Sequence, residues 1–193
     1  MTSPRIALAQ AISRDVLRAH ADDVDRCNRF PHEGVQALRE AGLVGLMLPA
    51  ARGGPGGSLR ELAGVAAALG EECLSTAMVW AMHSQQLAIL GRHAEPGLTT
   101  LLQRAARDGV LVASVTTEPG LGADLWQSVS PLQREGGRLR VQRTAPVVSY
   151  GEEAGLFLIK MRAPGERPPT DVAMVLVTRD EATLQVTGGW DAM

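Results

Sequence analysis

The first half of the chain repeats apolar residues at intervals of three and four positions, the spacing of one face of an amphipathic helix. The first predicted helix carries such a stripe, formed by Leu8, Ile12, Val16 and Ala19. A second helix is expected to begin at Pro31 and to stop at Gly42, because proline suits the first helical position and glycine the position after the last. A further helix is predicted to follow Pro96 and to end at residues 108–109, AspGly.

Two more helices are predicted between these. Ser58 and Glu61 have the spacing of a capping box, in which each side chain accepts a hydrogen bond from the other residue's backbone N–H. Ser75 is expected to cap the next helix, whose segment 77–82 is apolar on every side. A helix with no polar face is usually surrounded by its own domain, so we expect this one to be central.

Beyond residue 109 the helical spacing gives way to short runs rich in Val and Thr, separated by turn-forming residues. This change predicts an all-helical domain over residues 1–109 and a β-domain over residues 110–193. The predicted strands cover residues 110–116, 139–149, 156–162, 172–177 and 184–187.

Composition excludes several classes of protein. Lys and Arg number 19 against 21 Asp and Glu, a net charge of -2 over 193 residues, so no basic excess is available for a nucleic-acid partner. Cys27 and Cys73 are far apart and lack metal-ligand spacing, which favours two buried thiols in a reducing compartment. The N-terminus does not resemble a secretory signal, and the longest apolar run, 77–82, is too short to span a bilayer. We therefore expect a soluble, cytoplasmic protein without a membrane partner.

Two features that can indicate binding sites are weak here. The glycine-rich loop 52–57 precedes a helix but lacks the lysine of a phosphate-binding loop, which favours a simple turn. The second feature is the placement of the histidines. His83 ends an apolar helical segment, where a core histidine is the commoner case, and no two of the remaining histidines are spaced for one metal ion. No metal site is predicted.

The most informative segment is 114–124, SerValThrThrGluProGlyLeuGlyAlaAsp. It places hydroxyl groups and a glycine-rich turn at the end of a predicted strand. Such a group can bind the edge of a planar heterocycle or a pyrophosphate, but from chemistry alone a polar hairpin turn is the favoured interpretation. The same two interpretations apply to ValValSerTyrGly at 147–151.

Taken in order, four stretches resemble the first half of the acyl-CoA dehydrogenase family. Residues 30–49, followed by GlyGlyProGlyGly, resemble its early helix pair and glycine loop, and the helix bearing His83 resembles the helix that lines its acyl pocket. ThrGluProGlyLeuGlyAlaAsp at 117–124 resembles the ThrGluPro-x-x-GlySerAsp signature of its flavin-binding β-domain. GlyTrpAspAlaMet at 189–193 resembles the stretch that precedes the family's GlyMetArg-x-Thr element.

The resemblance implies an α+β multidomain fold, in which an all-α N-terminal domain is followed by an incomplete antiparallel β-barrel-like domain. It also implies FAD as the cofactor, with Ser149 at the position of a hydroxyl directed at flavin N5. The cofactor-contacting residues that it implies are Ser114, Thr116, Thr117, Gly122, Ala123, Val147 and Ser149. Of these, Gly122 and Ala123 would bind the pyrophosphate through backbone N–H groups. The substrate-contacting residues that it implies are Trp80, His83 and Ala123.

Two residues depart from the family pattern. Ala123 stands where the signature has serine, so one expected hydroxyl near the pyrophosphate is missing. Val147 stands where the family has the tryptophan that packs on the flavin. The change at Val147 bears on cofactor affinity and on electron transfer to a partner flavoprotein.

The family's catalytic base is a glutamate of the C-terminal helical domain, which this sequence does not contain. The resemblance therefore implies no catalytic residue in this chain, and it makes Glu118 a structural residue of the signature. It implies a second polypeptide that carries the remaining strands and the helical bundle, in a hetero-oligomer. An electron-transfer flavoprotein is a further possible partner.

The leading hypothesis is the N-terminal half or subunit of an FAD-dependent dehydrogenase that desaturates acyl-CoA or acyl-carrier-protein thioesters at the α,β position. A flavin monooxygenase of the same fold is the first alternative, and the loss of the signature serine and of the flavin-packing tryptophan favours it slightly. A non-catalytic scaffold subunit is the second alternative. The retention of Thr117 and Ser149 argues against it.

Overall fold

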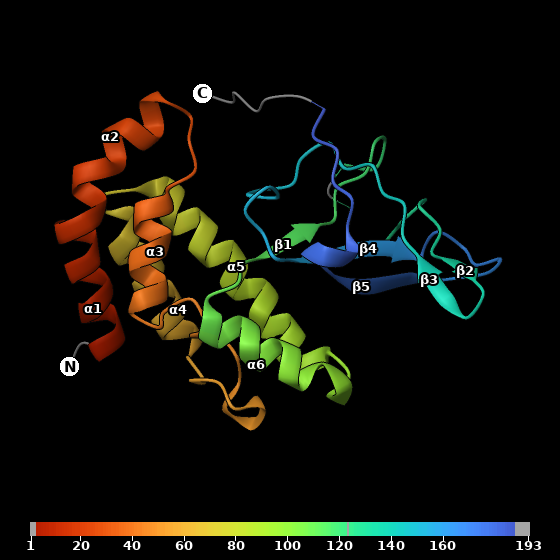
Figure 1. Cartoon of the computed structure of the whole chain (residues 1–193), viewed down its shortest axis with the longest axis horizontal. Helices are drawn as coiled ribbons and strands as arrows, with labels where there is room; N and C mark the ends of the chain where they lie inside the picture. The colour runs from red at the N-terminus through yellow and green to blue at the C-terminus, as the bar shows by residue number, and fades with distance from the viewer. Residues whose placement is uncertain (1–2, 123, 188–193) are drawn as a thin grey trace. The chain divides into compact units, whose positions relative to one another are not determined.

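The computed structural model describes residues 3–122 and 124–187. It forms two compact units, a helical unit that runs to Leu111 and a strand unit that spans Val112–Thr183. Figure 1 labels the helices and strands of both. The sequence analysis placed the division after residue 109. Among the described residues, no helix is long and apolar enough to cross a membrane.

The helical unit is built around its longest helix, α5. Its helices are α1 (Pro4–Ile12), α2 (Arg18–Arg26), α3 (His32–Glu40), α4 (Leu59–Gly70), α5 (Leu74–His93) and α6 (Thr99–Asp108). A π-helical turn, η1 (Ser13–Leu17), joins α1 to α2, and two 3-10 turns, η2 (Ala50–Arg52) and η3 (Pro96–Leu98), precede α4 and α6. Helix α4 packs against both α1 and α5, and α6 packs against α5. The predicted central helix is therefore α5.

The structure confirms most of the predicted helix ends. The Ser58 hydroxyl accepts a hydrogen bond from the Glu61 N–H at 3.2 Å, and the Glu61 carboxylate accepts one from the Ser58 N–H at 3.0 Å. Gly109 ends α6 with φ of +67°. The predicted cap at Ser75 is wrong, because α5 already begins at Leu74, after the extended backbone of Cys73. Ser75 lies in the first turn of the helix. Cys73 is buried, as predicted, whereas the prediction of a buried thiol is wrong for Cys27, which lies exposed at the end of α2.

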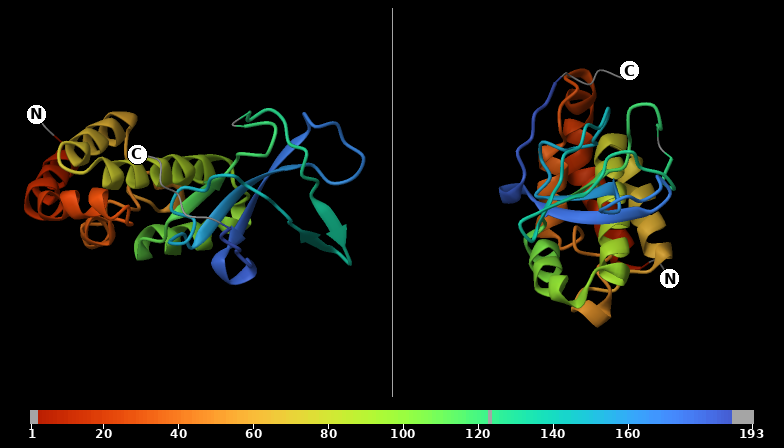
Figure 2. Two further views of the ribbon diagram at one scale, coloured as in Figure 1. Left: turned by 90° about the horizontal axis from the view of Figure 1, so that it is seen from above. Right: turned by 90° about the vertical axis from the view of Figure 1, so that its right-hand side faces the viewer.

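The strand unit contains a three-stranded sheet and a separate hairpin. Its strands are β1 (Val112–Val115), β2 (Gln133–Glu135), β3 (Arg138–Arg140), β4 (Leu156–Arg162) and β5 (Val172–Thr178), followed by a 3-10 turn, η4 (Arg179–Glu181). The order in the sheet is β1-β4-β5, while β2 pairs only with β3. The β2–β3 hairpin projects away from the sheet (Figure 2). Its turn residues, Gly136 and Gly137, both have positive φ, as a tight hairpin turn requires.

Several strand predictions need correction. The pairing of β1 with β4 is parallel rather than antiparallel, which the long connection over residues 116–155 allows. The predicted strand 139–149 is regular only at its start, in β3, and Pro146 within it has no N–H to donate to a ladder. Residues 184–187 form no strand, and β2 was not predicted.

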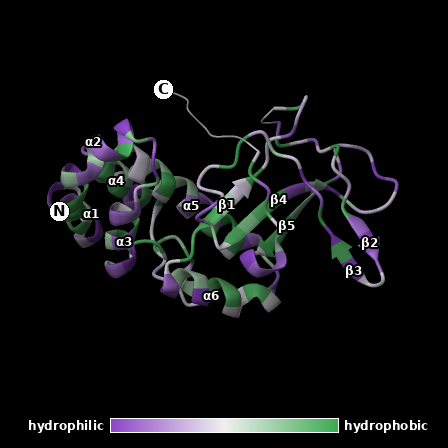
Figure 3. Cartoon of the chain, turned by 45° about the horizontal axis from the view of Figure 1, so that its top comes forward, coloured by the Kyte–Doolittle hydropathy of each residue, from purple (hydrophilic) through white to green (hydrophobic). Residues whose placement is uncertain are grey.

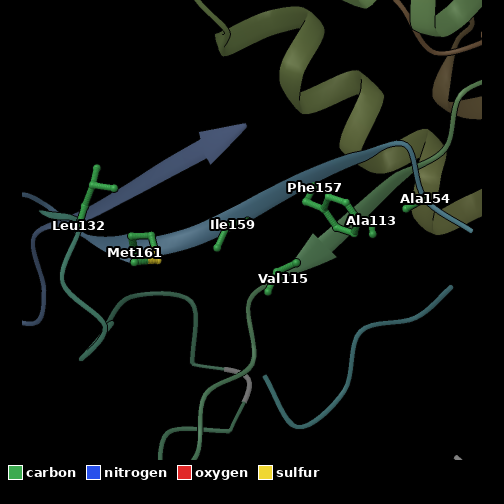
Figure 4. Packing of buried hydrophobic residues seen from close by; sticks show 7 residues of the cluster. All are labelled: Ala113, Val115, Leu132, Ala154, Phe157, Ile159 and Met161. Carbon is green, nitrogen blue, oxygen red and sulfur yellow. The ribbon is translucent and has the colours of Figure 1, made fainter. Parts of the chain in front are cut away.

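The core of the strand unit lies on one face of its sheet. Alternate residues of β1 and β4 point to this face (Figure 4), because side chains alternate along a strand. In Figure 3, β4 is mostly coloured as hydrophobic and β2 as hydrophilic, which agrees with the buried pattern of β4 and the exposed pattern of β2. The buried members of this core are Ala113, Val115, Leu132, Ala154, Phe157, Ile159 and Met161.

Candidate functional site

The predicted signature segment follows β1 and closes on itself as a tight turn. The Glu118 N–H donates to the Gly122 carbonyl at 3.1 Å, and the Gly122 N–H donates to the Glu118 carbonyl at 3.0 Å. Gly120 and Gly122 have φ of +81° and +58°, a backbone conformation that glycine adopts without strain. The predicted use of the Gly122 N–H for a pyrophosphate therefore needs correction, because the turn already uses this donor. Ala123, its predicted neighbour in that role, lies outside the described residues.

The Glu118 carboxylate anchors this turn in the interior of the strand unit. Its side chain is fully buried. Its Oε1 atom accepts hydrogen bonds from the Ser130 hydroxyl at 2.6 Å, the Ser130 N–H at 3.0 Å and the Ser128 hydroxyl at 3.2 Å. Burial raises the pKa of Glu118, but the Ser130 hydroxyl and the charge of Arg143 outweigh burial and hold the pKa below its usual range. Glu118 is therefore ionised at neutral pH.

Two cations from other parts of the unit reach the same carboxylate. Arg143 forms an ion pair with Glu118, and its side chain is only 4% exposed. Lys160, on β4, lies 3.8 Å from Glu118 and donates a hydrogen bond to the Asp124 carbonyl. The three side chains hold both ends of the signature turn through one buried charge cluster, here defined as Glu118, Arg143 and Lys160.

The second predicted segment, 147–149, is tied to the first. The Thr117 hydroxyl donates to the Val147 carbonyl at 3.0 Å, and the Tyr150 hydroxyl donates to the Val112 carbonyl of β1 at 3.0 Å. Val148, between them, packs against the core of the strand unit. The structure therefore brings Thr117 and Val147 together beyond the end of β1. Thr116 precedes Thr117 directly, and Ser149 lies two residues after Val147.

Ser114 lies apart from this group, inside β1. Its neighbours Ala113 and Val115 both belong to the core face of the sheet. Because side chains alternate along a strand, Ser114 points to the opposite face, where its partner in the adjacent strand is Leu158.

Trp80 and His83 lie in the core of the helical unit. The Trp80 indole N–H donates to the Leu43 carbonyl at 3.0 Å, and the His83 Nε2 atom lies 2.9 Å from the Val44 carbonyl. Burial lowers the pKa of His83 to about 4, against the effect of the Val44 hydrogen bond. In this structure both side chains fix the segment after α3 to α5. Their predicted contact with substrate stays a prediction.

The sequence analysis did not identify the cations of the charge cluster. Lys160 carried a usable signal, because it is the only lysine of the chain and stands within the apolar run LeuPheLeuIleLysMet, and a lysine is almost never fully buried unless it is paired. Arg143 carried no such signal, because its partners lie 13 to 27 residues away and two of them are backbone carbonyls. No group of three or more metal-ligating side chains is found within the described ranges.

Comparison with known proteins agrees with these observations. Residues 6–99 match the family model described as "Acyl-CoA dehydrogenase, N-terminal domain". The chain is 28% identical to acryloyl-CoA reductase (NADH) of Anaerotignum propionicum over 79% of this chain and 39% of that protein. It is 25% identical to a probable medium-chain specific acyl-CoA dehydrogenase of Caenorhabditis briggsae over 95% of this chain and 45% of the relative.

A solved structure shares the fold across both units. The FMN-bound crystal structure of TdsC from Paenibacillus sp. A11-2 is similar with a TM-score of 0.84 and 19% identity, over 98% of this chain and 47% of that one. The chain thus spans less than half the length of each of these three proteins. It belongs to the acyl-CoA dehydrogenase family, of which it carries the N-terminal domain and part of the middle domain.

Proposed function

We propose that this chain forms the N-terminal half of an FAD-dependent dehydrogenase that desaturates an acyl thioester, either acyl-CoA or an acyl-carrier-protein thioester. The observation that carries the proposal is the hydrogen bond between the Thr117 hydroxyl and the Val147 carbonyl. It joins the two segments to which family resemblance assigns flavin contact. Both segments lie at one edge of the strand unit, beyond the end of β1.

The residues at this edge suit the edge of a flavin. Thr116 and Ser149 carry hydroxyl groups, and Thr117 adds its backbone N–H, near an exposed apolar residue, Val147. Polar groups around an apolar surface are typical of a site for a planar heterocycle. When bound, FAD would accept the β-hydrogen of the thioester as hydride. The Ser149 hydroxyl would then be placed to donate to flavin N5. The pyrophosphate contact of Gly122 is not part of this proposal.

The α-proton of the thioester would be removed by a group outside this chain. Glu118 is unsuited to the role, because its carboxylate is buried and its Oε1 already accepts three hydrogen bonds beside Arg143. A general base must reach the proton that it abstracts. We propose that the base comes from the C-terminal half of the family fold, on a continuing chain or on a second polypeptide in a hetero-oligomer. An electron-transfer flavoprotein would then reoxidise the flavin.

The experiment is an anaerobic assay of the assembled protein, this chain together with the C-terminal half. Reduction of an electron-accepting dye on addition of acyl-CoA thioesters of several chain lengths is the expected result. A flavin-loaded assembly that reduces no dye with any acyl-CoA or acyl-carrier-protein thioester would contradict the proposal.

A flavin monooxygenase is the second candidate. Val147, in place of the tryptophan that packs on the flavin, favours it, and TdsC, which shares the fold, is a dibenzothiophene monooxygenase. The same assembled protein separates the two functions. Oxygen consumption with added reduced flavin and no dye reduction by thioesters would favour the monooxygenase.

A further inference from the structure

We propose that Arg143 is the positioning residue of the flavin-contacting edge. Its buried guanidinium holds the carbonyl groups of Thr116 and Thr117 and so fixes the direction in which the backbone N–H of Thr117 points. The inference rests on the proposed function and adds a residue to which the family signature gives no role.

The contacts of Arg143 are concentrated on two successive peptide groups. One guanidinium nitrogen, Nη2, donates to the Thr117 carbonyl at 2.7 Å and to the Thr116 carbonyl at 3.2 Å. The other, Nη1, donates to the Ser130 hydroxyl at 3.1 Å and forms the ion pair with Glu118. A planar guanidinium can hold several acceptors in one fixed arrangement, which an ammonium group cannot.

These contacts determine where the peptide N–H groups point. The described residues contain no cis peptide bond, and in a trans peptide the N–H points opposite to the C=O. The Thr117 N–H shares its peptide with the Thr116 carbonyl, so it points away from the buried guanidinium. The Glu118 N–H shares its peptide with the Thr117 carbonyl and donates to Gly122, so Arg143 also orients the tight turn.

Arg143 affects a bound ligand through its charge, in addition to its hydrogen-bond geometry. A cation that binds the Thr116 carbonyl polarises that peptide and makes the Thr117 N–H a stronger donor. With the side chain only 4% exposed, little water screens this charge. Negative charge on a heterocycle at the Thr117 N–H would therefore be stabilised, and a reduced flavin carries more negative charge than an oxidised one.

The test compares Arg143→Gln, Arg143→Lys and a control, Arg140→Gln, in the assembled protein. Arg140 is exposed on β3 and is paired with Glu135. Arg143→Gln removes the charged donor that holds the Thr116 and Thr117 carbonyls, so it should raise the dissociation constant of FAD about tenfold or more. Arg140→Gln should leave it unchanged. Arg143→Lys keeps the charge but lacks the planar guanidinium that holds several acceptors. It should therefore keep the wild-type midpoint potential of the flavin while its affinity for FAD stays reduced.

The midpoint potential separates positioning from a structural role. Loss of the charge in Arg143→Gln should lower the potential, whereas general loosening would weaken both redox forms equally and leave it unchanged. Should Arg143→Gln lose its cooperative unfolding transition, Arg143→Lys, which keeps the buried positive charge beside Glu118, is compared with the wild type by itself: reduced affinity for FAD at an unchanged potential is then the expected result. Wild-type affinity and potential in the Arg143 variants would overturn this inference alone. A wild-type assembly that binds no flavin would overturn the proposed function with it.

Discussion

At the scale of single residues, His83 makes the stability of the helical unit depend on pH. Burial lowers its pKa to about 4, and the charge of Arg39 contributes to the shift. Between about pH 6.5, the usual pKa of histidine, and pH 4, the unfolded chain binds a proton that the folded chain does not. The contribution of neutral His83 to the free energy of unfolding is therefore fully present above about pH 6.5. It falls as the pH drops to 4, by on the order of 3 kcal/mol.

Replacing His83 by Gln should remove this pH dependence. The free energy of unfolding, measured by urea denaturation at several pH values, should change less between pH 6.5 and 4 in the variant than in the wild type. His93→Gln is the matched control, because His93 is exposed at the end of α5. Parallel pH profiles for His83→Gln and the wild type would show that His83 does not carry the effect.

Thr117 is the residue that joins the two predicted flavin-contacting segments. Thr117→Val keeps the shape of the side chain and removes the hydrogen bond to the Val147 carbonyl. Because such a bond contributes about 1 kcal/mol, we expect the dissociation constant of FAD in the assembled protein to rise about fivefold. Thr144→Val, at an exposed site of the same unit, should have no effect, and equal affinities for both variants would contradict the assignment.

At the scale of elements, α5 depends on a close approach to the chain before η2. A Cβ atom added at Gly91 would lie 2.2 Å from Pro49 Cδ, whereas one added at Gly70 of α4 would meet only Ala77 Cβ, at 3.7 Å. Gly91→Ala should destabilise the protein by about 1–3 kcal/mol. Gly70→Ala should stabilise it by up to about 1 kcal/mol, because alanine has the higher helix propensity. Thermal unfolding should show shifts of opposite sign, and shifts of the same sign would contradict this packing.

The helices could be predicted from sequence more completely than the strands, for a physical reason. A capping box such as Ser58–Glu61 lies within one turn, so its pattern is local. The pairing of β1 with β4 joins residues more than 40 positions apart, and no local pattern specifies it. The same reason explains why some site residues could be predicted from sequence and others could not. Thr117 could be found in its motif, while the carbonyl contacts of Arg143 arise only from the folded loop.

At the scale of the whole molecule, the chain carries two units of a larger fold. It spans 39–45% of the curated relatives described above, and the proposed flavin edge lies entirely within its strand unit. The catalytic base of the proposal lies in the half that this chain does not carry. Activity is therefore expected of the assembly rather than of this chain by itself.

The most direct test of this account is the absorption spectrum of the chain, purified first by itself and then together with the C-terminal half of the fold. A bound flavin band is expected in the assembled protein, released as FAD on denaturation. An assembled, folded protein that carries no flavin and takes up none from added FAD would contradict the central claim and favour a scaffold role.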